Sequence, residues 1–234
     1  MSLSANRGRS RQSLARRVAD DIENGWYVNL GIGLPELVAG HIGAGKSVIL
    51  HSENGLLGMG GPAAPEAVDW DLINAGKKPV TLLPGGCYFD HLSSFTMMRG
   101  GHLDLCILGA FQVSEQGDLA NWWTGDPDEL PAVGGAMDLV TGTRRVFAIM
   151  DHVDRDGRPK LVSTCTYPLT GASVVNRVYT DLAVIDITPQ GMVVQEMVDS
   201  LDLKMLQEVT QAPLSAAPGL TLFARSDEDR RSSS

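Results

Sequence analysis

The sequence contains few cysteines, and their spacing indicates neither disulfides nor a metal site. Cys87, Cys106 and Cys165 are the three cysteines among 234 residues, and no Cys-x-x-Cys pair occurs. Disulfide frameworks need more cysteines, and structural zinc sites need closer ligand spacing. The five histidines are also scattered. We therefore predict no bound metal and a protein of a reducing compartment.

The sequence also lacks a long hydrophobic run. A membrane-spanning helix needs about 20 consecutive apolar residues, and no stretch approaches that length. Residues 1–19 carry five arginines and no acid, without the apolar centre of a signal peptide. We expect a soluble cytoplasmic protein with a disordered leader over residues 1–11 and a disordered tail over residues 226–234. The basic stretch is too short to favour an organellar transit peptide.

The charge balance argues against a nucleic-acid-binding surface. The net charge is −9 although the first residues are basic, so the remainder of the chain is more acidic still. Hydrophobic residues make up 43% and charged residues 20% of the sequence, as in soluble globular proteins. No repeat, low-complexity block or linker divides the chain, and we predict a single domain over residues 12–225.

Predicted strands and helices alternate along the chain. Short β-branched runs predict strands, and apolar residues spaced three or four positions apart predict helices. This alternation predicts an α/β fold with an open, largely parallel sheet and helices on both faces. Residues 181–187 and 192–196 predict a C-terminal β-hairpin, and glycines are expected to keep residues 58–62 irregular. The predicted strands are 26–30, 48–50, 80–83, 103–108 and 145–150, and the predicted helices are 12–24, 35–41, 91–98, 137–141 and 203–210.

A Gly-x-Gly turn follows the first predicted strand. Gly31 and Gly33 precede a helix that contains Pro35, which is half of the fingerprint of a dinucleotide-binding fold. The third glycine of that fingerprint is replaced by Glu36, so we reject a dinucleotide site. The turn can still offer backbone N–H groups to an anion at the helix N-terminus.

Glu53 is the candidate nucleophile. The buried strand 48–50 ends at His51-Ser52-Glu53, and Asn54-Gly55 is a turn signal. In an open α/β sheet, ligands bind beyond the carboxyl ends of the strands. A carboxylate there, among glycines that allow close approach, suits covalent catalysis. The alternative from spacing alone is a glutamate that caps the next helix or lies in a solvated turn.

The segment Ser52-Glu53-Asn54-Gly55-Leu56-Leu57-Gly58 resembles the active-site signature of the family I coenzyme A transferases. The similarity is to the B (β) subunit of the succinyl-CoA:3-oxoacid branch, and it extends from about Arg16 to about Val209. Further motifs occur in the family's order, which makes the resemblance specific. These are 29–35 (NLGIGLP), 71–77 (DLINAGK), 99–104 (RGGHLD), 108–114 (LGAFQVS), 117–122 (GDLANW), 134–140 (GGAMDLV) and 168–171 (PLTG).

The resemblance implies a CoA-transferase/NagB-like fold and a ping-pong reaction through a glutamyl-CoA thioester on Glu53. It implies coenzyme A esters as substrates, no permanently bound cofactor, and a partner A (α) subunit, with two copies of each subunit in a heterotetramer. CoA would move from succinyl-CoA to 3-oxoadipate, as in aromatic catabolism, or to acetoacetate, as in ketone-body metabolism. Residues 179–184 and 110–112, with His51, resemble the 3-oxoadipate enzymes slightly more.

The resemblance also implies roles for other residues. Backbone N–H groups of Gly134 and Gly135 would stabilise an oxyanion, although the pair is also typical of a plain turn. Lys77 would bind CoA phosphates or a substrate carboxylate, unless it is only a solvated surface lysine. The expected substrate-binding residues are Gly134, Gly135, Asn54 and Gln112, and the expected CoA-binding residues are Gly31, Gly33, Lys77 and Asn121.

The sequence leaves two other functions open. A non-catalytic domain that senses sugar phosphates on a related fold would not require a glutamate at position 53. An acyl-CoA hydrolase would release free CoA rather than transfer it to an acid.

Overall fold

The computed structural model describes residues 8–128, 130–131, 133–225 and 229. The chain divides into two compact units, which are described separately. Unit 1 comprises Met1–Leu14, Ala110–Gly134 and Phe147–Ser234, and unit 2 comprises Ala15–Gly109 and Gly135–Val146. The predicted single domain over 12–225 stays a prediction. Most of the predicted leader (1–7) and tail (226–228 and 230–234) lie outside the described residues.

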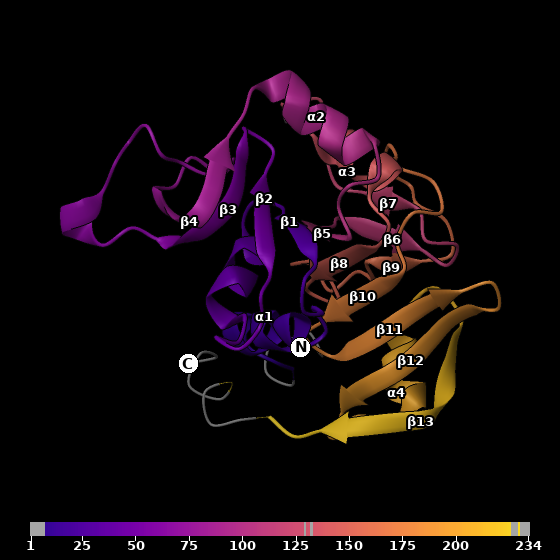
Figure 1. Cartoon of the computed structure of the whole chain (residues 1–234). Helices are drawn as coiled ribbons and strands as arrows, with labels where there is room; N and C mark the ends of the chain where they lie inside the picture. The colour runs from indigo at the N-terminus through magenta and orange to yellow at the C-terminus, as the bar shows by residue number, and fades with distance from the viewer. Residues whose placement is uncertain (1–7, 129, 132, 226–228, 230–234) are drawn as a thin grey trace. The chain divides into compact units, whose positions relative to one another are not determined.

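Unit 2 contains a sheet with the strand order β5-β1-β2-β3-β4. Strand β1 is parallel to β5 and to β2, whereas β2, β3 and β4 form successive antiparallel pairs. Figure 1 shows the chain between β3 and β4 extending away from this sheet. The strands are β1 (Tyr27–Leu30), β2 (Ile49–Ser52), β3 (Leu56–Pro62), β4 (Val80–Tyr88) and β5 (Leu105–Gly109).

The helices of unit 2 are short. Helix α2 (His91–Arg99) begins where the Asp90 carboxylate accepts a hydrogen bond from the Ser93 N–H at 2.8 Å, a common N-terminal cap. It packs against α3 (Ala136–Gly142). The turns η1 (Leu34–His41) and η2 (Pro65–Ala67) are 3₁₀ helices. Helix α1 (Arg11–Asp20) contains residues of both units.

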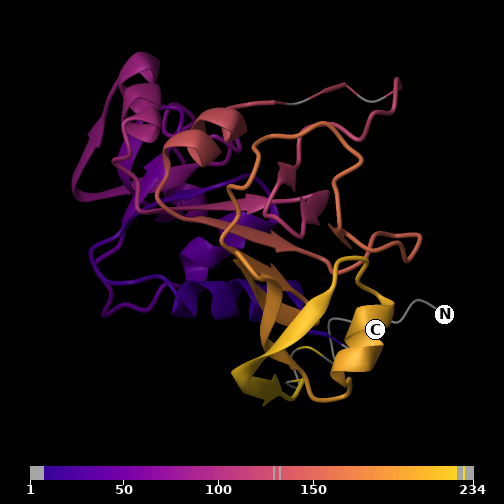
Figure 2. The ribbon, with the colours of Figure 1, turned by 90° about the vertical axis from the view of Figure 1, so that its right-hand side faces the viewer.

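Unit 1 contains two sheets. The larger has the order β13-β12-β11-β10-β8, and the smaller has the order β7-β6-β9. Strands β8 and β10 are parallel, β11 and β12 form an antiparallel hairpin, and β13 is parallel to β12. Helix α4 (Leu203–Glu208) lies beside β13 (Figure 2). The strands are β6 (Gln112–Ser114), β7 (Leu119–Ala120), β8 (Val146–Met150), β9 (Leu161–Val162), β10 (Arg177–Thr180), β11 (Ala183–Thr188), β12 (Gly191–Val198) and β13 (Leu214–Phe223).

The predicted α/β fold class and C-terminal hairpin are confirmed. Every residue of β8 is buried, as are the first four of β5, which explains why both are continuous apolar runs in the sequence. No helix in the described ranges is both long and apolar enough to cross a bilayer.

Some strands differ from the sequence-based expectation. Residues 58–62 belong to β3 rather than to an irregular segment, and β4 continues to Tyr88 instead of ending near residue 83. Shifts in the β3–β4 register accommodate the glycines, because a bulge lets extra residues bend out of the ladder. Strands β10 and β13 were not predicted from the sequence.

The close approach of α2 and α3 depends on Gly142. A Cβ atom at this position would overlap the Met98 carbonyl oxygen. Alanine normally stabilises a helix relative to glycine by about 1 kcal/mol, but here overpacking should dominate. We expect Gly142→Ala to lower the free energy of unfolding by about 1–3 kcal/mol in urea titrations.

Gly43→Ala is the matched control, because open space surrounds that position. Equal stability of the two variants would show that the α2–α3 contact does not restrict residue 142.

Candidate active site

Glu53 lies in the tight turn between β2 and β3. Ser52 pairs with Leu56 across the hairpin, and the Gly55 N–H donates a hydrogen bond to the Ser52 carbonyl at 2.9 Å. Gly55 has φ of +109°, and a side chain there would overlap the Phe89 carbonyl oxygen. Glycine is therefore required at residue 55, and the turn directs Glu53 beyond the end of β2.

The Glu53 carboxylate is half-buried against the start of α3. The Gly135 N–H donates a hydrogen bond to it, and Gly135 directly precedes the first residue of that helix. A Cβ atom on residue 135 would overlap Glu53 Oε2 and would also contact the ring of Phe95. The contact therefore requires glycine at residue 135, because the Glu53 carboxylate occupies the space that a side chain would fill.

The pKa of Glu53 is raised above its ordinary value, and burial is the largest cause of this shift. The Gly135 hydrogen bond and the nearby His91 act in the opposite direction, whereas the charge of Asp138 raises the pKa further. Asp138 is itself paired with Arg99 at 2.6 Å. The carboxylate thus loses part of its hydration while it keeps one hydrogen-bond donor. A less hydrated carboxylate is a stronger nucleophile once it is ionised.

His51 fastens the strand that carries Glu53. The Asn29 side-chain amide donates to His51 Nδ1 at 3.0 Å, so the ring proton lies on Nε2 and is directed to Ser94 Oγ at 3.2 Å. Burial lowers the pKa of His51 to about 4, which leaves the ring neutral. The ring therefore links β1, β2 and α2 in the interior of unit 2.

Asn54 and Ser52 attach residues 73–75 to the same turn. The Asn54 side-chain amide donates to the Ile73 carbonyl at 2.7 Å, and Ser52 Oγ accepts from the Ala75 N–H at 3.0 Å. The amide nitrogen of Asn54 is thus used within the chain. Its expected role in substrate binding stays a prediction.

Lys77, two positions after Ala75, lies in a turn and has a left-handed backbone conformation. Its side chain is exposed, its N–H donates to the Asn74 carbonyl at 2.9 Å, and its φ is +62°. A left-handed conformation costs a non-glycine residue about 1–2 kcal/mol. Glu36 holds the turn by accepting hydrogen bonds from the Asn74 amide at 3.0 Å and from Lys78 Nζ at 2.7 Å. Strain of this kind is concentrated at functional sites.

The predicted anion site at Gly31 and Gly33 is occupied by groups of the chain itself. The Gly31 N–H donates to the Ile107 carbonyl at 2.8 Å, and the Gly33 N–H donates to Glu36 Oε2 at 3.0 Å. The Glu36 carboxylate takes the place of the expected anion at the start of η1. Binding of CoA phosphates here stays a prediction that would require these hydrogen bonds to open.

The remaining predicted site residues belong to unit 1. Gln112 donates to Thr166 Oγ1 at 3.0 Å and accepts from the Thr166 N–H at 2.8 Å. Asn121 Oδ1 accepts from Thr170 Oγ1 at 2.6 Å. Both side chains thus form hydrogen bonds with the segment that connects β9 with β10. Gly134 has φ of +53°, so this member of the pair occupies a turn conformation that glycine favours.

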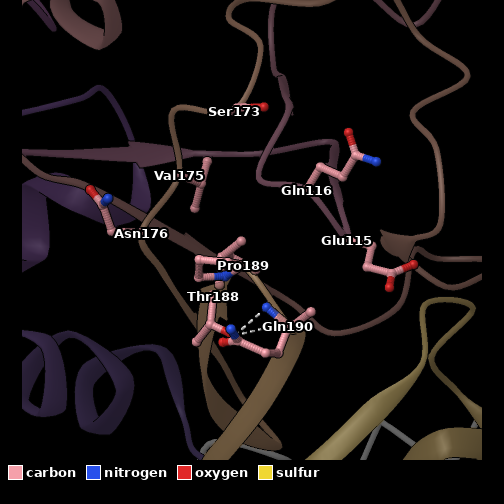
Figure 3. Close-up of a pocket in the computed structure, with 10 residues that line it drawn as sticks. Glu115, Gln116, Ser173, Val175, Asn176, Thr188, Pro189 and Gln190 are labelled. Atoms are coloured by element: carbon pink, nitrogen blue, oxygen red, sulfur yellow. Dashed lines mark hydrogen bonds between the residues drawn. The ribbon is translucent and has the colours of Figure 1, made fainter.

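A cavity of about 530 Å³ lies elsewhere in unit 1 (Figure 3). The turn after β6, the segment before β10 and the β11–β12 turn surround it, and the Gln190 N–H donates to Thr188 Oγ1 at 3.2 Å. None of the predicted site residues lines it. The lining residues are Glu115, Gln116, Ser173, Val175, Asn176, Ile187, Thr188, Pro189, Gln190 and Gly191.

His91, Phe95 and Asp138 were not predicted as neighbours of Glu53. The first two lie on α2 and the third lies on α3, and the predicted helices 91–98 and 137–141 cover all three. Predicting a helix from sequence does not show which of its faces packs against a distant loop. Here that loop is the Glu53 turn, which precedes both helices by about 40 residues or more. The sequence offered one signal for this neighbourhood: Asp138 belongs to the same motif, residues 134–140, as the glycine pair.

The chain matches known proteins along nearly its whole length. A model of the family described as coenzyme A transferase matches residues 11–205. The B subunit of the 3-oxoadipate CoA-transferase of Pseudomonas putida is 60% identical over 205 residues, which cover 88% of this chain and 96% of that protein.

Two longer proteins also match. The mitochondrial succinyl-CoA:3-ketoacid coenzyme A transferase 2 of Homo sapiens is 44% identical, over 90% of this chain but 41% of that protein. The crystal structure of an acyl-CoA transferase (YdiF) from Escherichia coli O157:H7, a thioester complex with CoA, has a TM-score of 0.71 at 20% identity. That match covers 92% of this chain and 43% of the structure's chain.

The raised pKa of Glu53 predicts how its removal affects stability. The folded state holds the proton more tightly than the unfolded state, so Glu53 lowers stability as pH rises through its folded-state pKa. Glu53→Gln removes the buried charge but keeps an acceptor for the Gly135 N–H. We expect the variant to be more stable than the original chain near pH 8, with an advantage that shrinks toward pH 4.

Urea unfolding of the full chain at several pH values measures this difference. Glu23→Gln, at an exposed glutamate of the same unit, should show no comparable change. An advantage for Glu53→Gln that does not depend on pH would contradict the account of burial.

Proposed function

Because this chain belongs to the coenzyme A transferase family, we propose that it acts as the B subunit of a succinyl-CoA:3-oxoacid CoA-transferase through a covalent glutamyl-CoA thioester on Glu53. The observation that supports this mechanism most is the half-buried Glu53 carboxylate beside the Gly135 N–H. The same contact provides a nucleophile and a donor for the charge that develops during attack.

The proposed reaction begins when the ionised Glu53 carboxylate attacks the carbonyl carbon of the donor acyl-CoA. The carbon–sulfur bond breaks, the CoA thiolate leaves, and an acyl-glutamyl anhydride forms. The thiolate then attacks the Glu53 carbonyl carbon, which releases the donor carboxylate and leaves the glutamyl-CoA thioester. The acceptor 3-oxoacid carboxylate attacks this thioester, and the same steps in reverse order release the acceptor as its CoA ester.

Gly135 is the proposed oxyanion donor. Thiolate attack at the Glu53 carbonyl carbon would place negative charge on a Glu53 oxygen, beside the N–H of Gly135 that donates to this carboxylate. One donor of this type contributes about 3–4 kcal/mol to the stability of the transition state. Gly134 is the second proposed donor because it directly precedes Gly135. The anhydride hydrolyses easily, so the reaction also needs a site that excludes water.

The proposed partner is an A subunit, since the 60% identical relative is named as the B subunit of its enzyme. That relative is a 3-oxoadipate enzyme, and we propose 3-oxoadipate as the acceptor. Acetoacetate is the alternative, because the human relative is named for 3-ketoacids. A comparison of kcat/KM for the two acceptors, with the A subunit co-expressed, decides between them.

Trapping the covalent intermediate tests the mechanism. The complex with its A subunit is incubated with succinyl-CoA and then with hydroxylamine, which converts a glutamyl thioester to a hydroxamate. We expect mass spectrometry to find the modification on the Glu53 peptide. Glu53→Gln should abolish the adduct and turnover, and Glu53→Asp should lower kcat by roughly a hundredfold or more because the nucleophile is withdrawn by one methylene.

Glu23→Gln is the matched control and should keep full turnover. The proposal would be abandoned if the Glu53 peptide stayed unmodified while CoA was transferred. Release of free CoA without an acyl-CoA product would instead indicate a hydrolase, and absence of both turnover and adduct would favour a non-catalytic sensing domain.

Lys77 is proposed to contact the phosphates of the CoA ester. Lys77→Gly relieves the left-handed backbone conformation, so we expect equal or higher stability. Loss of one exposed ion pair corresponds to about 1 kcal/mol, which predicts a KM for succinyl-CoA raised by about three- to tenfold with little change in kcat.

Steady-state kinetics at low and high ionic strength measure the Lys77 effect, which should diminish as salt screens the original contact. Lys204→Ala, at an exposed lysine of α4, serves as a control for charge removal, because alanine preserves the helix. An unchanged KM in Lys77→Gly would leave that lysine without a role in CoA binding.

A further inference from the structure

A long exposed segment of unit 2 lies beside the candidate active site. We define the β3–β4 arm as residues 61–90, which comprise the end of β3, the connection with η2, and β4 (Figure 1). It exposes Trp70 (72% exposed), Tyr88 (63%) and Leu83 (48%), and Leu92 (78%) follows on α2. Single exposed apolar residues are ordinary, but a concentration of large ones in one segment indicates an interaction surface.

The outer edge of the arm is a strand edge that is only partly covered, since the Val80 N–H donates to the Leu72 carbonyl at 3.1 Å. Strand β4 pairs with β3 on one side, and no strand among the described residues pairs with its other side. Its nine residues, Val80–Tyr88, include no charged side chain. Exposed edge strands usually carry charges that prevent pairing with another chain. Apart from the contact at Val80, Pro84 and the bulge in its pairing with β3, the described part of the chain gives β4 no such protection.

The connection within the arm is acidic. Asp69 and Asp71 flank the exposed Trp70, and the Asp71 N–H donates to Asp69 Oδ1 at 2.9 Å. Glu66 lies one turn earlier, and residues 61–76 contain no lysine, arginine or histidine. A partner that suits this surface has an apolar pocket for the indole ring, bordered by lysine or arginine side chains.

The arm is attached directly to the turn that carries Glu53. The contacts of Asn54 with Ile73 and of Ser52 with Ala75 bind one part of the arm to this turn. The Phe89 N–H donates to the Gly55 carbonyl at 3.0 Å, which binds the other end. A protein that covers the arm therefore lies next to Glu53, where the chemistry needs water to be excluded.

We propose that the β3–β4 arm is the surface on which the A subunit docks. This inference rests on the proposed function. The human and Escherichia coli relatives each contain, in one polypeptide, this chain's counterpart and a further segment of greater length. A separate B chain must bind such a segment through an exposed surface. A second copy of this chain fits less well, because the arm carries Glu66, Asp69, Asp71 and Asp90 against two lysines, so a two-fold contact would bring two surfaces of net negative charge together.

The exposed thiol of Cys87 on β4 tests the proposal in the unmodified chain. Iodoacetamide labelling is followed by mass spectrometry for the free chain and for its complex with the cognate A subunit. We expect that partner to slow labelling of Cys87 by roughly tenfold or more. Cys106, which is buried, should stay unlabelled in both samples and reports on unfolding.

Two outcomes of the labelling would overturn the proposal. The first is equal labelling of Cys87 in the free chain and in a complex of verified stoichiometry. The second is protection of Cys87 in the free chain by self-association, which would assign the arm to a second copy.

Substitutions provide an independent measurement. We expect Trp70→Ala and Leu83→Lys to weaken affinity for the A subunit by roughly tenfold or more, with unchanged circular dichroism and thermal unfolding of the free chain. Leu222→Lys is the matched control, because Leu222 is 59% exposed on β13, outside the arm. Binding should also weaken as salt concentration rises. Unchanged affinity in both arm variants would overturn the proposal.

The Glu53→Gln chain separates the two proposals. If this variant binds the A subunit with normal affinity and the arm variants bind it poorly, the docking surface is supported even when no glutamyl adduct forms. If the adduct forms in the original complex and the arm variants still bind the A subunit, the docking surface is wrong and the proposed function stands.

Discussion

The contact between the Glu53 carboxylate and the Gly135 N–H is the constraint on which the candidate site depends. It joins a hairpin turn to the start of a helix that lies more than about 80 positions later in the sequence. Both ends require glycine, because Gly55 adopts a positive φ against Phe89 and Gly135 leaves no room for a Cβ atom beside Glu53. The carboxylate can therefore approach a backbone donor more closely than side-chain packing would otherwise allow.

The interior of unit 2 supports this contact with neutral groups. His51 is buried two residues before Glu53, and its low pKa keeps it uncharged while it bonds to Asn29 and Ser94. Hydrogen bonds between neutral groups hold strand and helix in place without a second buried charge. The raised pKa of Glu53 reflects its own incomplete hydration.

Glu53 is half-buried, and residues 73–75 of the arm are hydrogen-bonded to the turn that carries it. Within the described part of the chain, the donor from Gly135 satisfies only part of the hydrogen-bonding capacity of a carboxylate. The adjacent arm carries exposed apolar residues and an unpaired strand edge. A half-buried carboxylate and an exposed apolar surface next to it are the two features expected of half a site. One partner chain would complete both by excluding water and adding donors.

Local patterns in the sequence were enough to locate most elements and to place the proposed nucleophile. Continuous apolar runs predicted the buried strands β5 and β8, and the Asn54-Gly55 turn placed Glu53 beyond β2, because these are properties of neighbouring residues. Ordered motifs along the chain indicated the family. The folded chain was needed to show that His91, Phe95 and Asp138 lie near Glu53 and Gly135, that the Glu36 carboxylate accepts the hydrogen bond of the Gly33 N–H, and that Gly58, Gly60 and Gly61 lie in a strand. Those facts depend on contacts between distant segments, which local patterns do not encode.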